Sequence, residues 1–84
     1  MNLEILTPSG KTYSGEVMGV QLPGITGSFE VLDNHAPLVS GLKAGQLKIF
    51  VEKNRNELYQ IQGGFVEVLN NKVTVLVEGS KPVE

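Results

Sequence analysis

The residues best suited to chemistry gather in the segment GSFEVLDNHAPLVSGLKAG, residues 27–45, which holds the only histidine of the chain, His35. A Ser–His–Asp set for nucleophilic catalysis would combine His35 with Asp33 and with Ser28 or Ser40. Asp33 is only two residues from His35, however, and neither serine lies in a nucleophile-elbow pattern. Because the spacing that such a set requires is missing, we do not expect catalysis at this segment.

Metal and cofactor sites have equally little support. The chain has one histidine and no cysteine, so a metal site would depend on carboxylates, and no calcium-loop spacing occurs. We leave open a catalytic site made of two carboxylates. Most glutamates, however, fall at strand ends or on polar faces, where a solvated charge is the ordinary explanation. The glycines of LPGITGS match neither phosphate-binding pattern. We therefore expect neither a metal nor a cofactor.

Two other roles remain for His35, which directly precedes Ala36 and Pro37. A structural role at the turn before a proline is common. A role at an interface is also open, because the surrounding segment is more apolar than a loop requires, with Phe29, Val31, Leu32 and Leu38.

Composition excludes several classes of protein. The 84 residues are enough for one domain and carry a net charge of −2 with interspersed signs, so no basic stripe for nucleic acid exists. Lys53 and Arg55 form the one local basic pair, which we interpret as a solvated hairpin tip. No apolar run approaches the ~18 residues of a membrane span, and the N-terminal residues do not resemble a signal peptide. We expect a soluble, intracellular protein without direct membrane insertion.

The elements that would hold these residues are strands. Valine occurs eleven times and alanine twice, and no segment offers ten uninterrupted residues with helical periodicity. The segments MGVQL, LKIFVE and VTVLVE alternate with a period of two, so that each places one set of apolar residues on one face. The pattern predicts an all-β fold, a flattened antiparallel β-sandwich or barrel of about eight to ten short strands.

The breaks between strands predict hairpin turns at TPSGK, KNRN and NNK, where asparagine and glycine supply positive φ angles. The pair Gly63–Gly64 predicts a bulge or a sharp bend, and the tail EGSKPVE is expected to be frayed. Several strands carry large apolar residues on both faces, among them Phe50, Leu76 and the run FVEVL. Either a very compact sandwich or a covered outer surface explains this pattern, and we weigh the two equally.

Four blocks carry a resemblance to a known family: LEILTPSGKTYSGEV, LPGITGSFEVLDNHAPLVSGLKAG, QLKI and IQGGFVEVLNNKVTVLVE. In this order they resemble the epsilon subunit of F-type ATP synthase, over residues 3 to about 78. The resemblance implies that residues 1–84 form a single epsilon-type β-sandwich domain that does no chemistry and binds no cofactor. It also implies a rotor component of the central stalk, which joins the gamma subunit to the membrane c-ring and couples ion-driven rotation to ATP synthesis. The alpha and beta subunits are reached through the assembled complex, at the cytoplasmic face of the bacterial cell membrane.

The resemblance also assigns residues to two partners. The side facing the c-ring matches the segments around the turn and loop of the second block, at Ser28, Phe29, His35, Ala36 and Pro37. The side facing gamma matches Thr7 and Ser40. Three positions depart from the usual pattern: Glu30 in place of glycine, and Asp33 and Ala44 in place of proline. If the usual glycine has a positive φ, Glu30 must bear strain of order 1 kcal/mol or shift the loop.

The C-terminal helical domain typical of the family is absent from this sequence, and its ending EGSKPVE favours a naturally short form. Two alternative functions stay open. One is a regulator that restrains ATP hydrolysis by the same complex, a role that the family's missing helices usually carry. The other is an unrelated small β-sandwich hydrolase or ligand-binding module, which requires a concave pocket with convergent polar groups around His35.

Overall fold

A computed structural model describes residues 1–83 of the chain, and this part contains strands and no helix. The all-β prediction is therefore confirmed, with a strand count at the upper end of the expected range. The strands are β1 (Asn2–Thr7), β2 (Gly10–Glu16), β3 (Gly19–Gly24), β4 (Gly27–Leu32), β5 (Leu38–Leu42), β6 (Gly45–Glu52), β7 (Arg55–Ile61), β8 (Gly64–Leu69), β9 (Lys72–Val77) and β10 (Ser80–Pro82).

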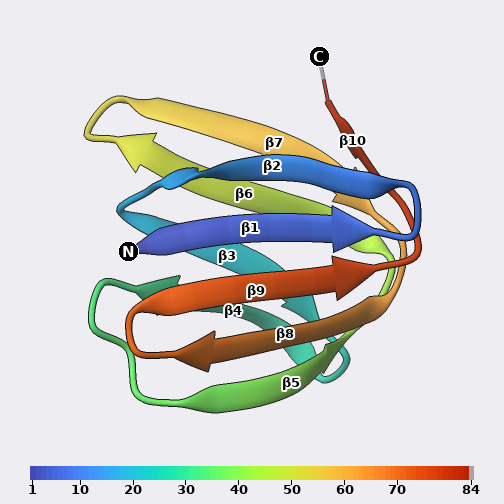
Figure 1. Ribbon diagram of the computed structural model, residues 1–84, viewed down its shortest axis with the longest axis horizontal. Helices are drawn as coiled ribbons and strands as arrows, with labels where there is room; N and C mark the ends of the chain where they lie inside the picture. Colours follow the sequence, from blue (N-terminus) through green and yellow to red (C-terminus); the bar gives the residue numbers. More distant parts are fainter. Residues whose placement is uncertain (84) are drawn as a thin grey trace.

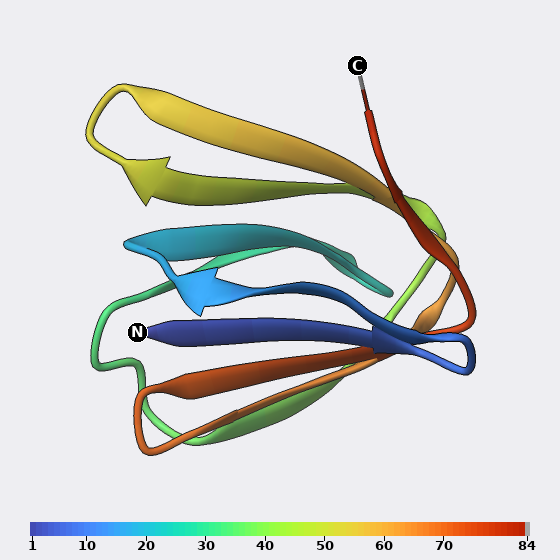
Figure 2. The same cartoon turned by 45° about the horizontal axis from the view of Figure 1, so that its top comes forward.

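The strands form one continuous sheet that folds into two layers (Figures 1 and 2). The hydrogen-bonded order is β10-β7-β6-β3-β5-β8-β9-β1-β2, and β4 pairs only with β3. We call β5-β8-β9-β1-β2 sheet I and β4-β3-β6-β7-β10 sheet II. Every pairing is antiparallel except β1 with β9, which run parallel. The period-two pattern could not reveal this, because alternation is the same in both kinds of ladder.

The core lies between the two layers and is entirely apolar within residues 1–83. The predicted alternation is confirmed in β6 and β9, where Leu47, Ile49, Val73 and Val75 are fully buried. In the segment MGVQL the prediction is wrong at one residue. Met18 precedes β3 and is 54% exposed, because the chain enters the strand only at Gly19.

The two ends of the sheet path meet through side chains. Tyr13 of β2 and Tyr59 of β7 pack edge to face, with ring centroids 5.8 Å apart. Partial burial raises the pKa of both tyrosine hydroxyls above the ordinary value. This aromatic contact closes the sandwich at a seam that has no backbone ladder between β2 and β7.

Three predicted hairpins are confirmed, at Pro8–Ser9, Lys53–Asn54 and Asn70–Asn71. Asn70 and Asn71 have φ angles of 51° and 60°, which suit the tight turn between two twisted antiparallel strands. Within residues 1–83, positive φ angles occur only at three asparagines and two glycines. Glu30 is not among them, and it lies in β4 opposite Gln21, so the expected strain is not present.

The predicted bend at Gly63–Gly64 is also found, where the chain leaves β7 in sheet II and enters β8 in sheet I. A Cβ atom at Gly64 would lie 1.9 Å from the carbonyl oxygen of Leu76 and 2.9 Å from the Cα atom of Val77. Only glycine lets β8 start this close to β9.

The prediction of a frayed tail is wrong for residues 80–83; residue 84 lies outside the described part. Ser80–Pro82 form β10 against Tyr59–Ile61 of β7, and the amide of Val83 donates to the carbonyl of Leu58 at 2.8 Å. An edge strand accepts a proline where its missing N–H would face solvent, so Pro82 did not exclude a strand here.

The outer face of sheet I carries a charged centre. The carboxylate of Glu4 on β1 lies 2.9 Å from the Nζ atom of Lys11 on β2 and 3.5 Å from that of Lys72 on β9. The hydrogen bond from Lys11, opposed by partial desolvation and supported by the charges of both lysines, lowers the pKa of Glu4.

We expect Gly64→Ala to lower the free energy of unfolding by about 2–3 kcal/mol or more, because β8 and β9 must separate to admit the methyl group. Urea unfolding measures this. Gly15→Ala is the matched control, since its Cβ would meet nothing closer than 3.8 Å. Equal stability of the two variants would show that the β8–β9 contact is not as tight as described.

We expect Glu4→Gln to destabilise the fold at neutral pH, because the amide has no charge to offer the two lysines. Folding lowers the pKa of Glu4, so its stabilising effect is present above the ordinary glutamate value of about 4.3 and is lost as the pH falls through the folded value. Urea unfolding at several pH values should show the difference from the wild type shrinking toward acid.

The control for this experiment is Glu67→Gln. Glu67 lies on the same outer face, opposite Thr74, and makes no ion pair within the described chain. A pH profile of the Glu4 variant that matches the profile of this control would contradict the assignment.

Candidate interaction surfaces

The His35 loop, residues 33–37, connects β4 to β5 at one end of the sandwich (Figure 1). The His35 amide donates to the carbonyl of Leu32 at 3.2 Å, and its ring nitrogen Nδ1 lies 2.7 Å from the carbonyl oxygen of Ala36. The side chains of His35, Ala36 and Pro37 are exposed. The imidazole therefore meets a neighbouring backbone group at a turn, in agreement with the structural role.

The residues of the candidate triad are dispersed. Ser28 lies opposite Pro23 near the start of β4, one strand length away from His35. The hydroxyl of Ser40 donates to the carbonyl of Gly41 at 3.3 Å. Asp33 accepts hydrogen bonds from the amino group of Met1 at 2.9 Å and from the amide of Asn71 at 3.1 Å, and the amino group in particular lowers its pKa.

Residues 1–83 also hold no cluster of three or more His, Asp or Glu side chains that could bind a metal ion. A hollow of about 420 Å³ lies near the His35 loop and is lined by Met18, Leu32, Asp33, Phe50, Glu52, Lys53 and Asn56. His35 does not line it. Within the described residues, this hollow therefore does not supply the convergent polar pocket around His35 that a hydrolase or ligand-binding module requires.

The residues assigned to the c-ring fall into two groups at opposite ends of β4. Ser28 accepts a hydrogen bond from Gln21 on the outer face of sheet II, near the turn at 25–26. Phe29 is half-buried and packs against the core, in space that the missing Cβ of Gly24 leaves open. The His35 loop lies at the other end (Figure 1). The two groups are joined by β4, whose second edge has no strand partner within the described chain.

The two residues assigned to gamma do not lie together either. Thr7 ends β1, where its hydroxyl donates to the carbonyl of Gly10 and accepts from the amide of Ser9, which fixes the hairpin turn. Ser40 lies on β5 opposite buried Val66, so its half-buried side chain points to the core side of sheet I. Only Thr7 is placed beside an exposed apolar surface.

That surface is a row of apolar side chains across sheet I, at the end of the molecule away from the His35 loop. The pairings Gly41–Phe65, Phe65–Leu76 and Leu76–Leu6 put these residues in register on β5, β8, β9 and β1. Ile25 reaches from the β3–β4 turn into the space where a Cβ of Gly41 would lie, 2.6 Å from its Cδ1 atom. We call Ile25, Phe65, Leu76 and Leu6 the apolar row.

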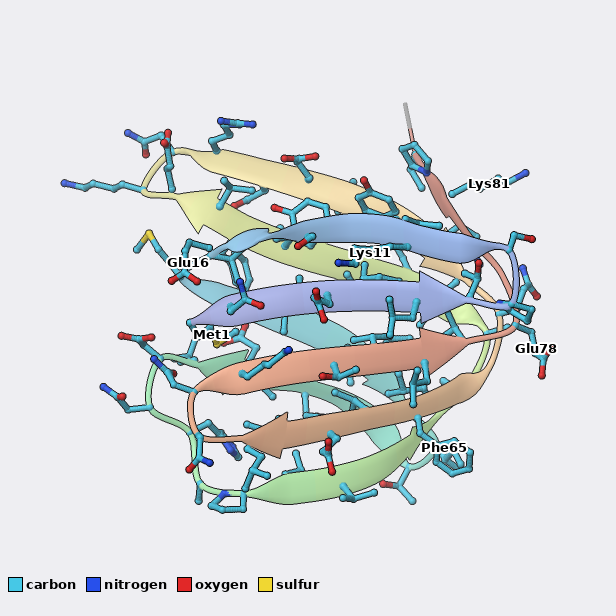
Figure 3. The ribbon with its side chains drawn as sticks, viewed as in Figure 1. Met1, Lys11, Glu16, Phe65, Glu78 and Lys81 are labelled. Atoms are coloured by element: carbon cyan, nitrogen blue, oxygen red, sulfur yellow. The ribbon has the colours of Figure 1, made fainter. Side chains whose placement is uncertain are left out.

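The apolar row is open to solvent. Phe65 is 61% exposed, Leu76 49% and Ile25 66%, and Figure 3 shows Phe65 projecting at the end opposite Met1. A hollow of about 370 Å³ beside the row is lined by Leu6, Thr7, Pro8, Gly63, Gly64, Phe65, Leu76, Val77 and Glu78. The next register position across the sheet carries Glu67, Thr74 and Glu4 on β8, β9 and β1, and Val39, which is 70% exposed, on β5. A contiguous apolar patch with polar residues along most of its border is typical of a protein interface.

Sequence reasoning found part of this surface. Apolar residues on both faces of the segments FVEVL and VTVLVE pointed to it, and the exposure of Phe65 and Leu76 now excludes internal packing as their explanation. Ile25 and Leu6 were missed, because only strand register and the turn at 25–26 bring them beside Phe65. The one feature of the sequence that could have indicated the place of Ile25 was Gly41, which has no side chain and lies in the middle of an apolar strand.

The fold is shared with subunits of solved ATP synthases. The chain superposes with a TM-score of 0.89 and 23% identity on a chain of the Euglena gracilis mitochondrial ATP synthase, over 95% of this chain and 51% of that one. A chain of the Tetrahymena thermophila central stalk and c-ring structure gives a TM-score of 0.82 and 20% identity, over 96% and 65% of the two chains. At these identities the likeness concerns the fold.

Sequence relatives carry the assignment further. A family model described as ATP synthase, Delta/Epsilon chain, beta-sandwich domain matches residues 1–82. The ATP synthase epsilon chain of Chlorobium limicola is 41% identical over 76 residues, which are 90% of this chain and 86% of the relative. That of Maridesulfovibrio salexigens is 49% identical over 83 residues, which are 98% of this chain but 58% of the relative. The chain therefore belongs to the ATP synthase delta/epsilon family, whose β-sandwich domain it forms.

Proposed function

We propose that this chain is the epsilon-type rotor subunit of an F-type ATP synthase, a non-catalytic part of the central stalk. It joins the gamma subunit to the membrane c-ring and couples ion-driven rotation to ATP synthesis. The observation that carries the proposal is the exposed apolar row, on a chain whose described residues assemble no catalytic set. The relatives named ATP synthase epsilon chain, and the central stalk and c-ring named for the Tetrahymena structure, support it.

The subunit works at the cytoplasmic face of the bacterial cell membrane, held there through the complex and without direct insertion. Among the residues that the structure describes, no helix has the length and apolar character to cross a bilayer. The alpha and beta subunits are reached through the assembled complex, and nucleic acid is no partner.

The apolar row is the surface that binds gamma in this proposal. Phe65 stands at its centre, with Leu76 on one side and Ile25 on the other, and burial of such residues is a main source of binding energy. Thr7 lines the hollow next to the row and holds the β1–β2 turn in place. Ser40 does not contact gamma directly in this proposal, because its side chain lies on the core side of β5.

The c-ring contact follows the free edge of β4. This edge connects Ser28 at one end with the His35 loop at the other, so a partner along it reaches both groups. The strand contributes Glu30 and Leu32 to the outer face of sheet II between them. Phe29 supports the edge from the core side and contributes its exposed rim.

We expect Phe65→Ser to weaken binding to gamma by about thirtyfold, the effect of losing a central apolar anchor of about 2 kcal/mol. Titration calorimetry with purified gamma measures it. Leu69→Ser is the matched control, because Leu69 lies on the same strand and face, is 48% exposed and stands at the far end of β8. Equal losses for both variants, or no binding of the wild type to gamma, would overturn the gamma assignment.

We expect Ser28→Ala and His35→Ala each to weaken association with c-ring-containing membranes by about three- to tenfold, since each removes one polar contact, and to leave gamma binding unchanged. Asn54→Ala serves as control, at the exposed tip of the β6–β7 turn. If only one of the two variants weakens association, the contact is confined to one end of β4.

The alternative function, a regulator that restrains ATP hydrolysis, is tested by measuring ATP hydrolysis of the complex with and without this chain. Only the regulator requires that the chain inhibit hydrolysis.

A further inference from the structure

Long-range hydrogen bonds converge on Asn71, in the turn between β8 and β9. Its Nδ2 atom donates to the Oδ1 atom of Asp33 at 3.1 Å, and its Oδ1 atom accepts from the backbone amide of Asn34 at 2.8 Å. Its own carbonyl accepts from the amide of Asn2 at 3.1 Å. One residue thus connects three segments that are far apart in the sequence.

We infer that Asn71 is a positioning residue, which holds the His35 loop in the form that meets the c-ring. The inference rests on the proposed c-ring contact of that loop. The two side-chain bonds of Asn71 act together as a clamp, which we call the Asn71 clamp.

The loop needs such a clamp because it has little structure of its own. Residues 33–37 lie outside the ladders of β4 and β5, and Asn34 has a φ of 63°, a conformation that unconstrained residues seldom adopt. The other bonds of His35 go to Leu32 and Ala36, its close neighbours in the sequence. These local bonds shape the turn but do not fix it relative to the sandwich. Asp33 alone has a further anchor, the amino group of Met1.

An amide side chain matches both partners at this position. It has to donate to a carboxylate and accept from a backbone amide at once, which asparagine does and aspartate does not. The turn also requires a positive φ, which asparagine tolerates well. Asn70 has a φ of 51° in the same turn, but its side chain makes no hydrogen bond to the loop within residues 1–83. Both asparagines meet the backbone requirement of the turn, but only Asn71 bonds to the loop. A comparison of variants at the two positions therefore distinguishes the effect of the clamp from the effect of the turn.

The clamp also connects the two proposed interfaces. β8 carries Phe65 of the apolar row at its beginning and leads into the turn of Asn71 at its end. Asn71 thereby ties the loop that faces the c-ring to the strand that faces gamma. The loop and the strand of Phe65 are thus connected by hydrogen bonds of Asn71.

The experiment compares Asn71→Gly with Asn70→Gly in the full chain, since glycine keeps the turn at either position. Hydrogen exchange followed by NMR reports the Asn34 amide directly. We expect Asn71→Gly to speed its exchange by about tenfold and Asn70→Gly to change it by less than about twofold. Association with c-ring-containing membranes should fall about fivefold for Asn71→Gly alone, with gamma binding unchanged for both variants.

A reciprocal exchange distinguishes positioning from a general loss of stability. Asn71→Asp alone sets two carboxylates against each other at residues 33 and 71 and should weaken c-ring association. Adding Asp33→Asn removes the repulsion between the two carboxylates and should recover part of the association. Recovery is incomplete because the Oδ1 atom of Asp33 that accepts from Asn71 also accepts from the amino group of Met1 at 2.9 Å, and an amide nitrogen at that place cannot accept. Urea unfolding of both variants shows whether stability changes in parallel. Recovery of stability without recovery of association would overturn the positioning role.

Two further outcomes would contradict the positioning role of Asn71. Unchanged exchange of the Asn34 amide in Asn71→Gly would show that the clamp does not hold the loop. Faster exchange with normal c-ring association, in an assay where His35→Ala is defective, would show that the loop contacts the ring but needs no positioning. If His35→Ala is also normal, the proposed c-ring contact itself fails, while the exchange result still tests the clamp.

Discussion

The arrangement of the whole molecule depends on the way in which β3 shares its edges. One edge pairs with β4 along its length, and the other pairs first with β6 and then, at Gly24, with Leu42 of β5. Gly24 has to be glycine, because a Cβ atom would lie 2.5 Å from the carbonyl of Gly27 and 2.9 Å from the ring of Phe29. This crowding keeps the β3–β4 hairpin tight at the residue where β3 also reaches β5, so that β3 links the two layers.

The same arrangement explains why one small domain can present two different surfaces. Sheet I turns its outer face away from sheet II, and the apolar row occupies only one end of that face, beyond the ion pairs of Glu4. The charged centre limits the apolar row on β1 and β9, because burying Glu4, Lys11 and Lys72 under a partner would cost desolvation free energy even though their charges are paired. The surface that we assign to gamma is therefore limited in extent and register, while the other end of the molecule carries the His35 loop together with the exposed side chains of Met18, Leu32 and Leu69.

Strand periodicity and turn residues were enough to predict the class of fold, the hairpins and the bend at Gly63–Gly64, because each depends on residues close in the sequence. The parallel pairing of β1 with β9 and the strand β10 depend on distant partners, and no local pattern encodes them. For the surfaces, apolar residues on both faces of β8 and β9 fitted a compact sandwich and a covered outer surface equally well, and the exposure of Phe65 and Leu76 favours the second. The separation of Ser28 from His35 and the role of Asn71 could not be predicted, since both follow from tertiary contacts between segments.

The parallel ladder between β1 and β9 also has a consequence for synthesis of the chain. Leu3 and Ile5 pack in the core beside Val73 and Val75, which a ribosome adds some seventy residues later. Until then β1 can pair only with β2, and its apolar side chains remain in water. Contacts between such distant segments make folding slow, and exposed strand edges favour aggregation meanwhile. The nascent chain therefore has its greatest need of a chaperone until the residues of β9 have been added.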